Sequence, residues 1–219
     1  MTISTEAKAM AWLEKLPEAD SVSIKRLQTL VDLLAGENTR QNLVSTASLA
    51  SVWLRHIVDS AQLLTHVPRE TSGPWLDLGT GAGFPGLVIA ALSPERPVHL
   101  VESRARRIEW LRRAADAIGL HNVTVHGARL EAVESFPAAI ISARAFAPLD
   151  KLLTLSARFS TADTVWLLPK GRSAAQELQE LGGWDHMFHV EQSLTDAEAG
   201  VIVGTLSGPV RQARKGQYP

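Results

Sequence analysis

The chain has 219 residues, of which 45% are hydrophobic and 21% charged, with a formal net charge of -1 and no cysteine. This length and composition allow a folded core, exceed one typical domain without reaching two, and make disorder unexpected. The lack of cysteine excludes disulfides, thiolate metal sites and cysteine nucleophiles. The sequence contains no run like a membrane span and no signal peptide at its start, so we expect a cytoplasmic protein without membrane association.

The charges nearly cancel but are unevenly distributed. Residues 101–115 carry five arginines against two glutamates, whereas residues 176–198 carry six acids and no Lys or Arg. Three more basic residues lie in the predicted tail at 209–219, namely Arg211, Arg214 and Lys215. A partner meets local patches rather than the average charge, so near neutrality does not exclude a nucleic acid.

The first part of the chain has apolar residues at helical spacing, as in Ile24, Leu27, Leu30, Val31 and Leu34. We predict a helical cap over residues 1–72. A polar loop at 36–46 interrupts it, and Ser45 or Thr46 is expected to cap the next helix.

Residues 73–208 alternate short apolar strands with amphipathic helices, which is typical of the α/β class with a parallel sheet covered on both faces. We predict strands at 75–78, 97–102, 122–126, 138–142 and 163–168, and helices near 85–92, 104–118, 148–159 and 173–181. The last two predicted strands, 186–192 and 200–206, are too close for a crossover helix. They are expected to form an antiparallel hairpin at the sheet edge.

The stretch LDLGTGAGFPG, residues 76–86, follows the first predicted strand and contains two overlapping fingerprints. Gly81, Gly83 and Gly86 spell G-x-G-x-x-G, which is typical of a dinucleotide site. Starting at Asp77, the same stretch spells D-x-G-x-G-x-G, the loop by which many methyltransferases hold S-adenosylmethionine; its glycines are Gly79, Gly81 and Gly83. Either ligand would lie at the carboxyl ends of the strands.

Two acidic residues near the loop bear on the choice between the two fingerprints. Glu102 ends the next strand, 19 residues after Gly83, where a carboxylate accepts hydrogen bonds from ribose hydroxyls in both interpretations. We expect Asp77 to point at the mouth of the loop, where it suits a sulfonium and an ammonium better than a pyrophosphate. A structural turn capped by Asp77 is the alternative. With the terminal hairpin, these features favour a class I, Rossmann-like methyltransferase.

The residue types present also limit which chemical group could accept the methyl group. Forming 5-methylcytosine needs a cysteine, and methylation of an exocyclic amine typically uses a proline-rich motif that IISARAFAPLD, after the fourth strand, lacks. Hydroxyl methylation needs a base or a metal. His56 is a candidate base, although a single helical histidine more often packs or caps, and His186 and His189 fall on opposite faces of one predicted strand, against a metal site. Guanine N7 has a free lone pair and needs only alignment and a suitable field.

Arg106 and Arg107 lie in the first turn of the helix predicted to start near Ser103. The helix dipole disfavours cations there by ~0.3–1 kcal/mol each, so we hypothesise that they bind RNA phosphates; solvated arginines are the alternative. Later charges on this helix are spaced as i, i+4 pairs, namely Glu109 with Arg113 and Arg112 with Asp116.

Several motifs together carry a more specific resemblance: LDLGTGAGFPG, SRARRIEWLRR, SARAFAPLDKLL, LLPKG, and QNLVST followed by RHIVDS. They resemble the glucose-inhibited division protein B family, also called ribosomal RNA small subunit methyltransferase G, over nearly the whole chain. The resemblance implies a class I fold with a helical cap. It also implies that S-adenosylmethionine is converted to S-adenosylhomocysteine while N7-methylguanosine forms in the 530 loop of bacterial 16S ribosomal RNA. The expected partner is that RNA or the 30S particle, and the expected state is a monomer.

The resemblance also implies roles for individual residues. Donor contacts fall on Gly79, Phe84, Leu130, Glu131 and Arg144. Polar positions around the RNA and the reaction fall on Asn42, His56, Arg106, Arg107, Arg129 and Lys170. Of these, Asn42, His56, Arg129 and Lys170 are the expected catalytic residues. Lys170 would approach guanine O6 or a phosphate, or is a plain surface lysine. The chain has Glu37-Asn38 where the family often has Trp-Asn, and Arg106 where Lys is common.

Two other function classes remain open from the sequence. A small-molecule or protein methyltransferase would share the donor site, and transfer of label to ribosomal particles would separate it. A non-catalytic, S-adenosylmethionine-dependent RNA-binding regulator would not turn the donor over. A nicotinamide oxidoreductase is disfavoured by the hairpin and by Asp77.

Overall fold

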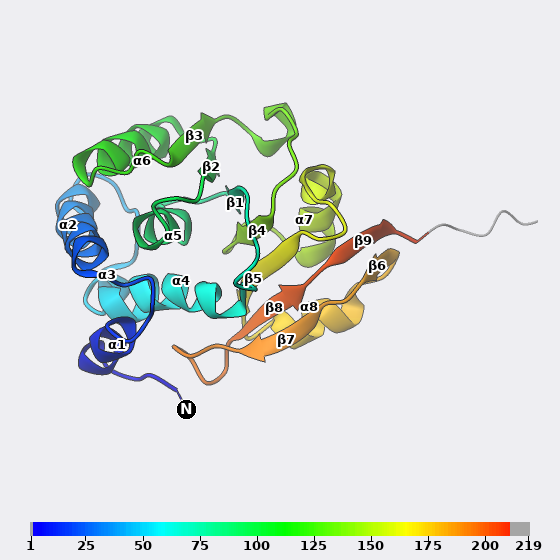
Figure 1. Cartoon of the computed structure of the whole chain (residues 1–219), viewed down its shortest axis with the longest axis horizontal. Coiled ribbons are helices and arrows are strands. Elements are labelled where there is room, and N and C mark those ends of the chain that lie inside the picture. Colours follow the sequence, from blue (N-terminus) through cyan, green and yellow to red (C-terminus); the bar gives the residue numbers. More distant parts are fainter. Residues whose placement is uncertain (1, 211–219) are drawn as a thin grey trace, which may run out of the picture.

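A computed structural model describes residues 2–210, beginning with helical segments that pack on one side of a sheet (Figure 1). These segments are α1 (Glu6–Leu13), α2 (Ser21–Asn38), α3 (Thr46–Leu49), the π-helical turn η1 (Trp53–Val58), α4 (Asp59–Ala61) and the 3-10 turn η2 (Gln62–His66). Within the described residues, no helix combines the length and the apolar character that a membrane crossing requires.

The remaining elements alternate as the sequence predicts. They are β1 (Trp75–Leu78), α5 (Gly86–Leu92), β2 (Val98–Glu102), α6 (Ala105–Ala117), β3 (Val123–Gly127), η3 (Leu130–Ala132), β4 (Ile140–Ala143), α7 (Leu149–Ser156), η4 (Ala157–Phe159), β5 (Val165–Gly171), α8 (Ala174–Glu180), β6 (Trp184–His186), β7 (His189–Gln192), β8 (Gly200–Gly204) and β9 (Leu206–Pro209). The main sheet has the order β3-β2-β1-β4-β5-β8-β7. Strands β1 to β5 are parallel, and β8 is antiparallel to both β5 and β7. The predicted fold class, including the terminal hairpin, is confirmed.

Alternation along the buried strands sends side chains into two hydrophobic cores. Trp75 of β1 joins a core with α1, α2, α5 and α6, whereas Leu76 and Leu78 join a second core with η3, α7 and α8. Figure 1 shows the N-terminal helices, α5 and α6 gathered at one end of the molecule and α7 and α8 at the other. The helices before residue 72 share their core with the sheet, so a domain boundary there stays a prediction.

The predicted loop at 36–46 is partly helical, because α2 continues to Asn38. The Asn38 side chain then organises the turn: its Oδ1 accepts from the amides of Leu43 (2.9 Å) and Val44 (3.0 Å), and its Nδ2 donates to the Val44 carbonyl (3.1 Å). Ser45 caps α3 as predicted, accepting from the Ser48 amide at 3.1 Å.

The predicted strand at 186–192 is wrong, since β6 ends at His186 and β7 begins at His189. Strand β6 pairs with β9 in a separate two-stranded sheet. The two histidines therefore do not lie on opposite faces of one strand. The predicted tail begins inside β9, because that strand extends to Pro209, and its basic residues, Arg211, Arg214 and Lys215, lie outside the described residues.

A half-buried amide fixes the connection between α5 and β2. Nδ2 of Asn122 donates to the carbonyls of Ala90 (3.1 Å), Ser93 (3.0 Å) and Arg96 (2.9 Å). We expect Asn122→Ala to lower the free energy of unfolding by about 1–2 kcal/mol, because it removes the donor shared by these carbonyls. Urea unfolding measures the loss. Asn42→Ala is the matched control: its side chain is exposed and forms no hydrogen bond with residues 2–210, so an equal loss would contradict the assignment.

Candidate functional site

The glycine-rich loop after β1 needs its glycines for geometric reasons. Gly79, Gly81 and Gly83 have φ angles of 61°, 60° and 104°, in the region that favours glycine. A Cβ on Gly79 would lie 2.5 Å from Cδ2 of Phe146, and a Cβ on Gly83 would overlap Leu87. The loop therefore packs tightly against the segment that follows β4 and against the start of α5.

Asp77 does not point at the mouth of this loop, contrary to expectation. It is fully buried, and its Oδ1 accepts from Ser142 Oγ of β4 (2.8 Å) while its Oδ2 accepts from the Gly86 amide (3.0 Å). The Ser142 hydroxyl also accepts from Trp75 Nε1 at 2.8 Å. Burial raises the pKa of the Asp77 carboxyl to about 6, against the lowering effect of its hydrogen bonds. Asp77 thus fixes the ends of the loop and, within the described chain, lines neither of the two cavities described below.

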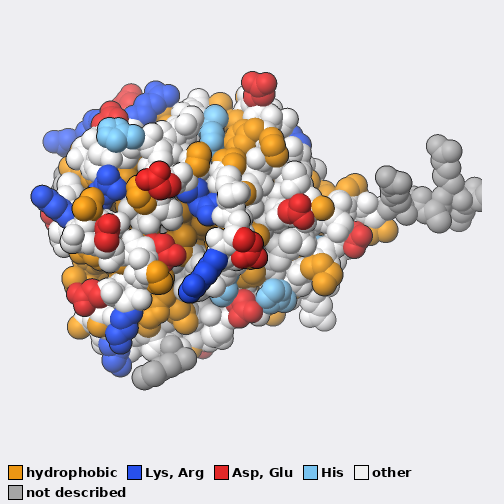
Figure 2. Space-filling view, viewed as in Figure 1, with side chains coloured by type: hydrophobic (Ala, Val, Ile, Leu, Met, Phe, Trp, Pro, Cys, Tyr) orange, Lys and Arg blue, Asp and Glu red, His pale blue; other side chains and the backbone are white. Residues whose placement is uncertain are grey.

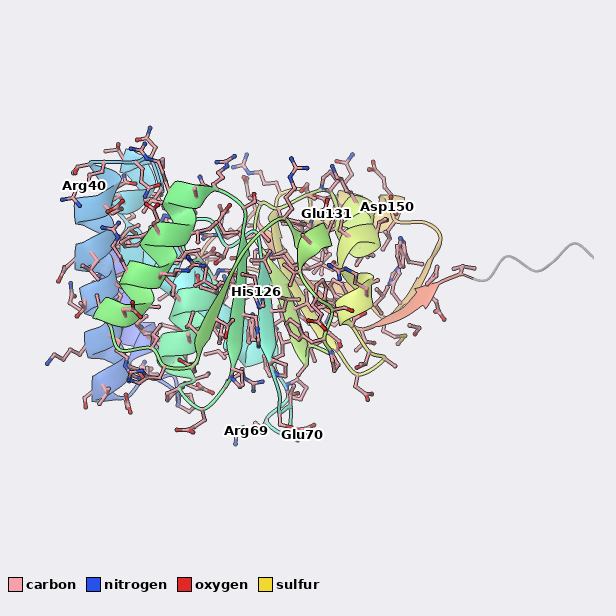
Figure 3. The ribbon with its side chains drawn as sticks, turned by 90° about the horizontal axis from the view of Figure 1, so that it is seen from above. Arg40, Arg69, Glu70, His126, Glu131 and Asp150 are labelled. Carbon is pink, nitrogen blue, oxygen red and sulfur yellow. The ribbon has the colours of Figure 1, made fainter. Side chains whose placement is uncertain are left out.

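The first cavity, of about 430 Å³, opens at the carboxyl ends of β1, β2 and β3. Gly79, Glu102, Leu130 and Glu131 line it. Oε1 of Glu102 accepts from two backbone amides, Ser103 at 2.7 Å and Arg104 at 2.9 Å. Its Oε2 lies 3.8 Å from a nitrogen of Arg107, which leaves room to accept from a ligand hydroxyl. Figure 3 places Glu131 at the opposite end of the molecule from Arg69 and Glu70, which precede β1.

The second cavity, of about 580 Å³, lies beside the ends of β4 and β5 and has a charged wall. Its cations and anions are paired: Lys170 with Glu177 (2.8 Å), Arg144 with Asp59 (3.3 Å) and Arg55 with Asp196 (3.4 Å). The side chain of Lys170 is 7% exposed and also donates to the Ala147 carbonyl at 2.6 Å. Lys170 is thus a buried, fixed group and not a surface lysine.

His56 lines the second cavity from the π-helical turn η1, and it is set up as a hydrogen-bond donor. Its Nδ1 lies 3.2 Å from Nη2 of Arg144, which only donates, so the proton of the neutral ring sits on Nε2. Burial, together with Arg144 and Arg55, lowers the pKa of His56 to about 3. Nε2 is buried and has no partner among residues 2–210. The candidate role of His56 as a base does not fit this geometry, because Nδ1, its accepting nitrogen, already faces Arg144.

The other predicted site residues divide between the cavities. Arg129 lines the first cavity with Leu130 and Glu131, whereas Arg144 lines the second. Phe84 lies beneath the second cavity, with its ring stacked on His56 (4.9 Å between centroids) and under the Arg144 guanidinium (5.4 Å). Asn42 is exposed and, within the described chain, absent from both cavity walls. The structure therefore does not bring Asn42 to the candidate site.

Arg106 and Arg107 lie in the first turn of α6 as predicted, but they face different surroundings. Arg107 lines the first cavity beside Glu102. Arg106 lines a separate surface depression between α2 and α6 that it shares with Arg40, Arg112 and Arg113. The expected pair of Arg113 with Glu109 is wrong, because Arg113 binds Glu37 of α2 at 2.8 Å. Figure 2 shows Lys and Arg side chains over the end of the molecule that carries α1, α2 and α6, with Asp and Glu side chains among them, and few over β6 and β7.

Five charged or aromatic residues that line the second cavity were missed from the sequence: Arg55, Asp59, Phe146, Glu177 and Asp196. Arg55 and Asp59 belong to the RHIVDS motif and Phe146 to SARAFAPLDKLL, so the motifs contain a signal that residue-by-residue reasoning did not use. Glu177 and Asp196 fall in the acidic segment 176–198, whose charges alone do not indicate which of them faces the cavity.

The order of the sheet, the glycine loop and the two cavities at its carboxyl edge define a class I methyltransferase fold. Solved structures agree with this class. A putative O-methyltransferase from Klebsiella pneumoniae matches with a TM-score of 0.56 at 13% identity, covering 92% of this chain and 97% of that one. Aeropyrum pernix fibrillarin, solved with natively bound S-adenosylmethionine, matches with a TM-score of 0.54 at 14% identity, covering 69% and 75%.

Sequence comparison narrows the class to a family. The family model described as GidB, rRNA small subunit methyltransferase G, matches residues 23–195. Proteins named ribosomal RNA small subunit methyltransferase G are 65% identical in Novosphingobium aromaticivorans (94% of this chain, 90% of that protein) and 59% identical in Erythrobacter litoralis (92% and 97%). The chain belongs to the rRNA small subunit methyltransferase G family.

Asp77 leads to a prediction about pH and stability. Its pKa is raised from 3.8 to about 6 in the folded chain, so folding favours the protonated form. The contribution of Asp77 to the free energy of unfolding is therefore greatest below pH ~4 and falls by about 3 kcal/mol as the pH rises through 6. Urea unfolding of Asp77→Asn at pH 4 and pH 7 should lack this fall. The exposed Asp185→Asn is the control and should retain it; identical pH profiles for both variants would refute the burial argument.

His56 leads to the opposite pH dependence. Its pKa is lowered from 6.5 to about 3, so the unfolded chain takes up a proton that the folded chain rejects. The contribution of His56 to the free energy of unfolding is fully present above pH ~6.5 and is lost as the pH falls toward 3, by on the order of 5 kcal/mol. His56→Gln should therefore lose less stability than wild type between pH 7 and pH 4.5. Exposed His121→Gln is the matched control, expected to follow wild type.

Proposed function

We propose that this chain transfers the methyl group of S-adenosylmethionine to N7 of a guanine in the 530 loop of 16S ribosomal RNA. Family membership supports the donor and the substrate class. The choice of guanine N7 as the acceptor rests on the hydrogen bonds and ion pairs of the second cavity. Its histidine is a donor and its three carboxylates, Asp59, Glu177 and Asp196, are engaged by cations, so the cavity suits an acceptor that has no proton to lose.

The first cavity fits the adenosyl part of S-adenosylmethionine. Oε2 of Glu102 is free to accept from ribose hydroxyls, while Leu130 offers apolar contact to the adenine. Gly79 leaves room in the cavity wall for the Phe146 ring, since a side chain there would collide with that ring. When bound, the donor supplies an electrophilic methyl group and leaves as S-adenosylhomocysteine.

The second cavity fits the acceptor guanine. Guanine N7 becomes part of a cationic ring when it gains a methyl group, so extra positive charge beside it is unfavourable. Pairing of Lys170, Arg144 and Arg55 with carboxylates and the neutral state of His56 keep the net charge of this wall low. Lys170, which lines the same wall, would orient a polar edge of the base.

Arg106 would contact RNA phosphates beyond the target base. It lines the depression between α2 and α6 with Arg40, Arg112 and Arg113. Because Arg40 and Arg113 pair with Glu37 (3.8 and 2.8 Å), Arg106 and Arg112 would supply the phosphate contacts. Arg107 would act closer to the donor, because it faces Glu102. We further propose that a monomer acts on the RNA or on the 30S particle, in the cytoplasm where ribosomes assemble.

The test is methyl transfer to 30S subunits from cells that lack this gene. Labelled S-adenosylmethionine and the wild-type chain should produce labelled N7-methylguanosine, identified by nucleoside digestion and mapped to the 530 loop. Glu102→Gln should lower kcat/KM for the donor about 10- to 100-fold, because its amide nitrogen cannot accept from a ribose hydroxyl. The exposed Glu134→Gln is the matched control and should match wild type.

Two results would overturn the proposal. Label in a nucleoside other than N7-methylguanosine would reject the acceptor. Label that goes only to a small molecule or a protein, or no turnover of the donor, would assign the chain to another function class.

A further inference from the structure

The two cavities share a single stretch of wall. Ala145, Phe146 and Ala147, which follow β4 after Arg144, line both of them. A methyl group that moves from a donor in the first cavity to a base in the second must pass this segment. A side chain on this segment is therefore placed to face both ligands.

Phe146 is the aromatic side chain at this junction. It is half-buried, and its ring lies directly over the glycine loop, where Cδ2 would be 2.5 Å and Cε2 3.2 Å from a Cβ on Gly79. The missing side chain of Gly79 therefore creates the space that the ring uses. Its edge packs on the second hydrophobic core, which restrains the ring.

The backbone around Phe146 is held in an unusual conformation. Ala145 has a φ of 53°, and it is the one non-glycine residue with positive φ in the described part of the chain. Such strain persists where surrounding contacts enforce it, and it concentrates at functional sites. The segment is fixed on both sides: Arg144 binds Asp59 and His56, and the Ala147 carbonyl accepts from Lys170. The ion pairs of the second cavity thus position Phe146.

We propose that Phe146 stacks on the face of the acceptor guanine and holds N7 in line with the donor methyl group. The inference rests on the proposed function and deepens it. Aromatic side chains bind bases by stacking without needing a particular base, so the contact positions the ring while polar groups read its edge.

Stacking on Phe146 also strengthens as the reaction proceeds. The lone pair of N7 forms the new N–C bond, the S–C bond breaks with its electrons going to sulfur, and no proton moves. Positive charge passes from the sulfonium to the purine ring. The face of a phenyl ring attracts a cationic ring more than a neutral one, so Phe146 stabilises the transition state more than the ground state.

The test compares Phe146→Leu, which keeps an apolar side chain but removes the aromatic face, with Phe146→Tyr and Phe146→Trp, which keep a face. With the donor saturating, Phe146→Leu should lower kcat on 30S subunits about 10- to 100-fold, and the aromatic variants should stay within about threefold of wild type. The Kd for S-adenosylmethionine, measured by calorimetry without RNA, should change less than about threefold. Phe136→Leu, a half-buried phenylalanine of the same core outside both cavities, is the matched control and should keep full kcat.

Three outcomes would overturn the stacking role. If Phe146→Leu keeps kcat while its Kd for the donor rises, the ring belongs to the donor site. If kcat and Kd are both unchanged, the ring serves only to pack the protein. If kcat falls equally in Phe136→Leu, the loss reflects the core and not the base. If the wild-type chain forms no N7-methylguanosine, the proposed function itself is wrong. Failure of the proposed function is thus distinguished from failure of the stacking role.

Discussion

The buried carboxylate of Asp77 holds the reacting end of the sheet together. Through Ser142 it ties β1 to β4, and through the Gly86 amide it ties β1 to the start of α5. Trp75 completes the set by donating to the same serine. Because both ends of the glycine loop are fixed to one group, the loop keeps the shape that its positive φ angles require. The desolvation of this carboxylate, seen in its raised pKa, is the cost of that arrangement.

The two cavities follow from this arrangement. Parallel strands β1 and β4 are neighbours at the point where the strand order reverses, so the segments that follow them meet above the sheet. The segment after β1 carries the glycines and that after β4 carries Arg144 and Phe146. The helical segments before residue 72 add His56 and Asp59, which bind Arg144 and thereby fix the β4 segment. The N-terminal helices therefore complete the acceptor cavity as well as the core.

Much of the fold was predictable because its signals are local. Alternation of apolar strands with helices, the glycine spacing and the short connection before β8 are readable along the chain. The site was less predictable, because the hydrogen bonds and protonation of its side chains depend on residues far apart in the sequence. Asp77 was found by its motif, but its hydrogen bonds to Ser142 and its full burial depend on the pairing of β1 with β4. The neutral, donor state of His56 depends on Arg144, 88 residues away. Likewise, Arg113 pairs with Glu37 of α2 and not with Glu109, the partner that helical spacing predicts.

The central claim is that donor and acceptor occupy separate cavities joined at Phe146. A crystal structure of the chain with S-adenosylhomocysteine tests it most directly. The account predicts ribose hydroxyls on Oε2 of Glu102, adenine beside Leu130, and the sulfur at Phe146, facing the cavity of His56 and Lys170. Adenosine bound instead in the cavity of His56 and Lys170, with Glu102 still free, would contradict it.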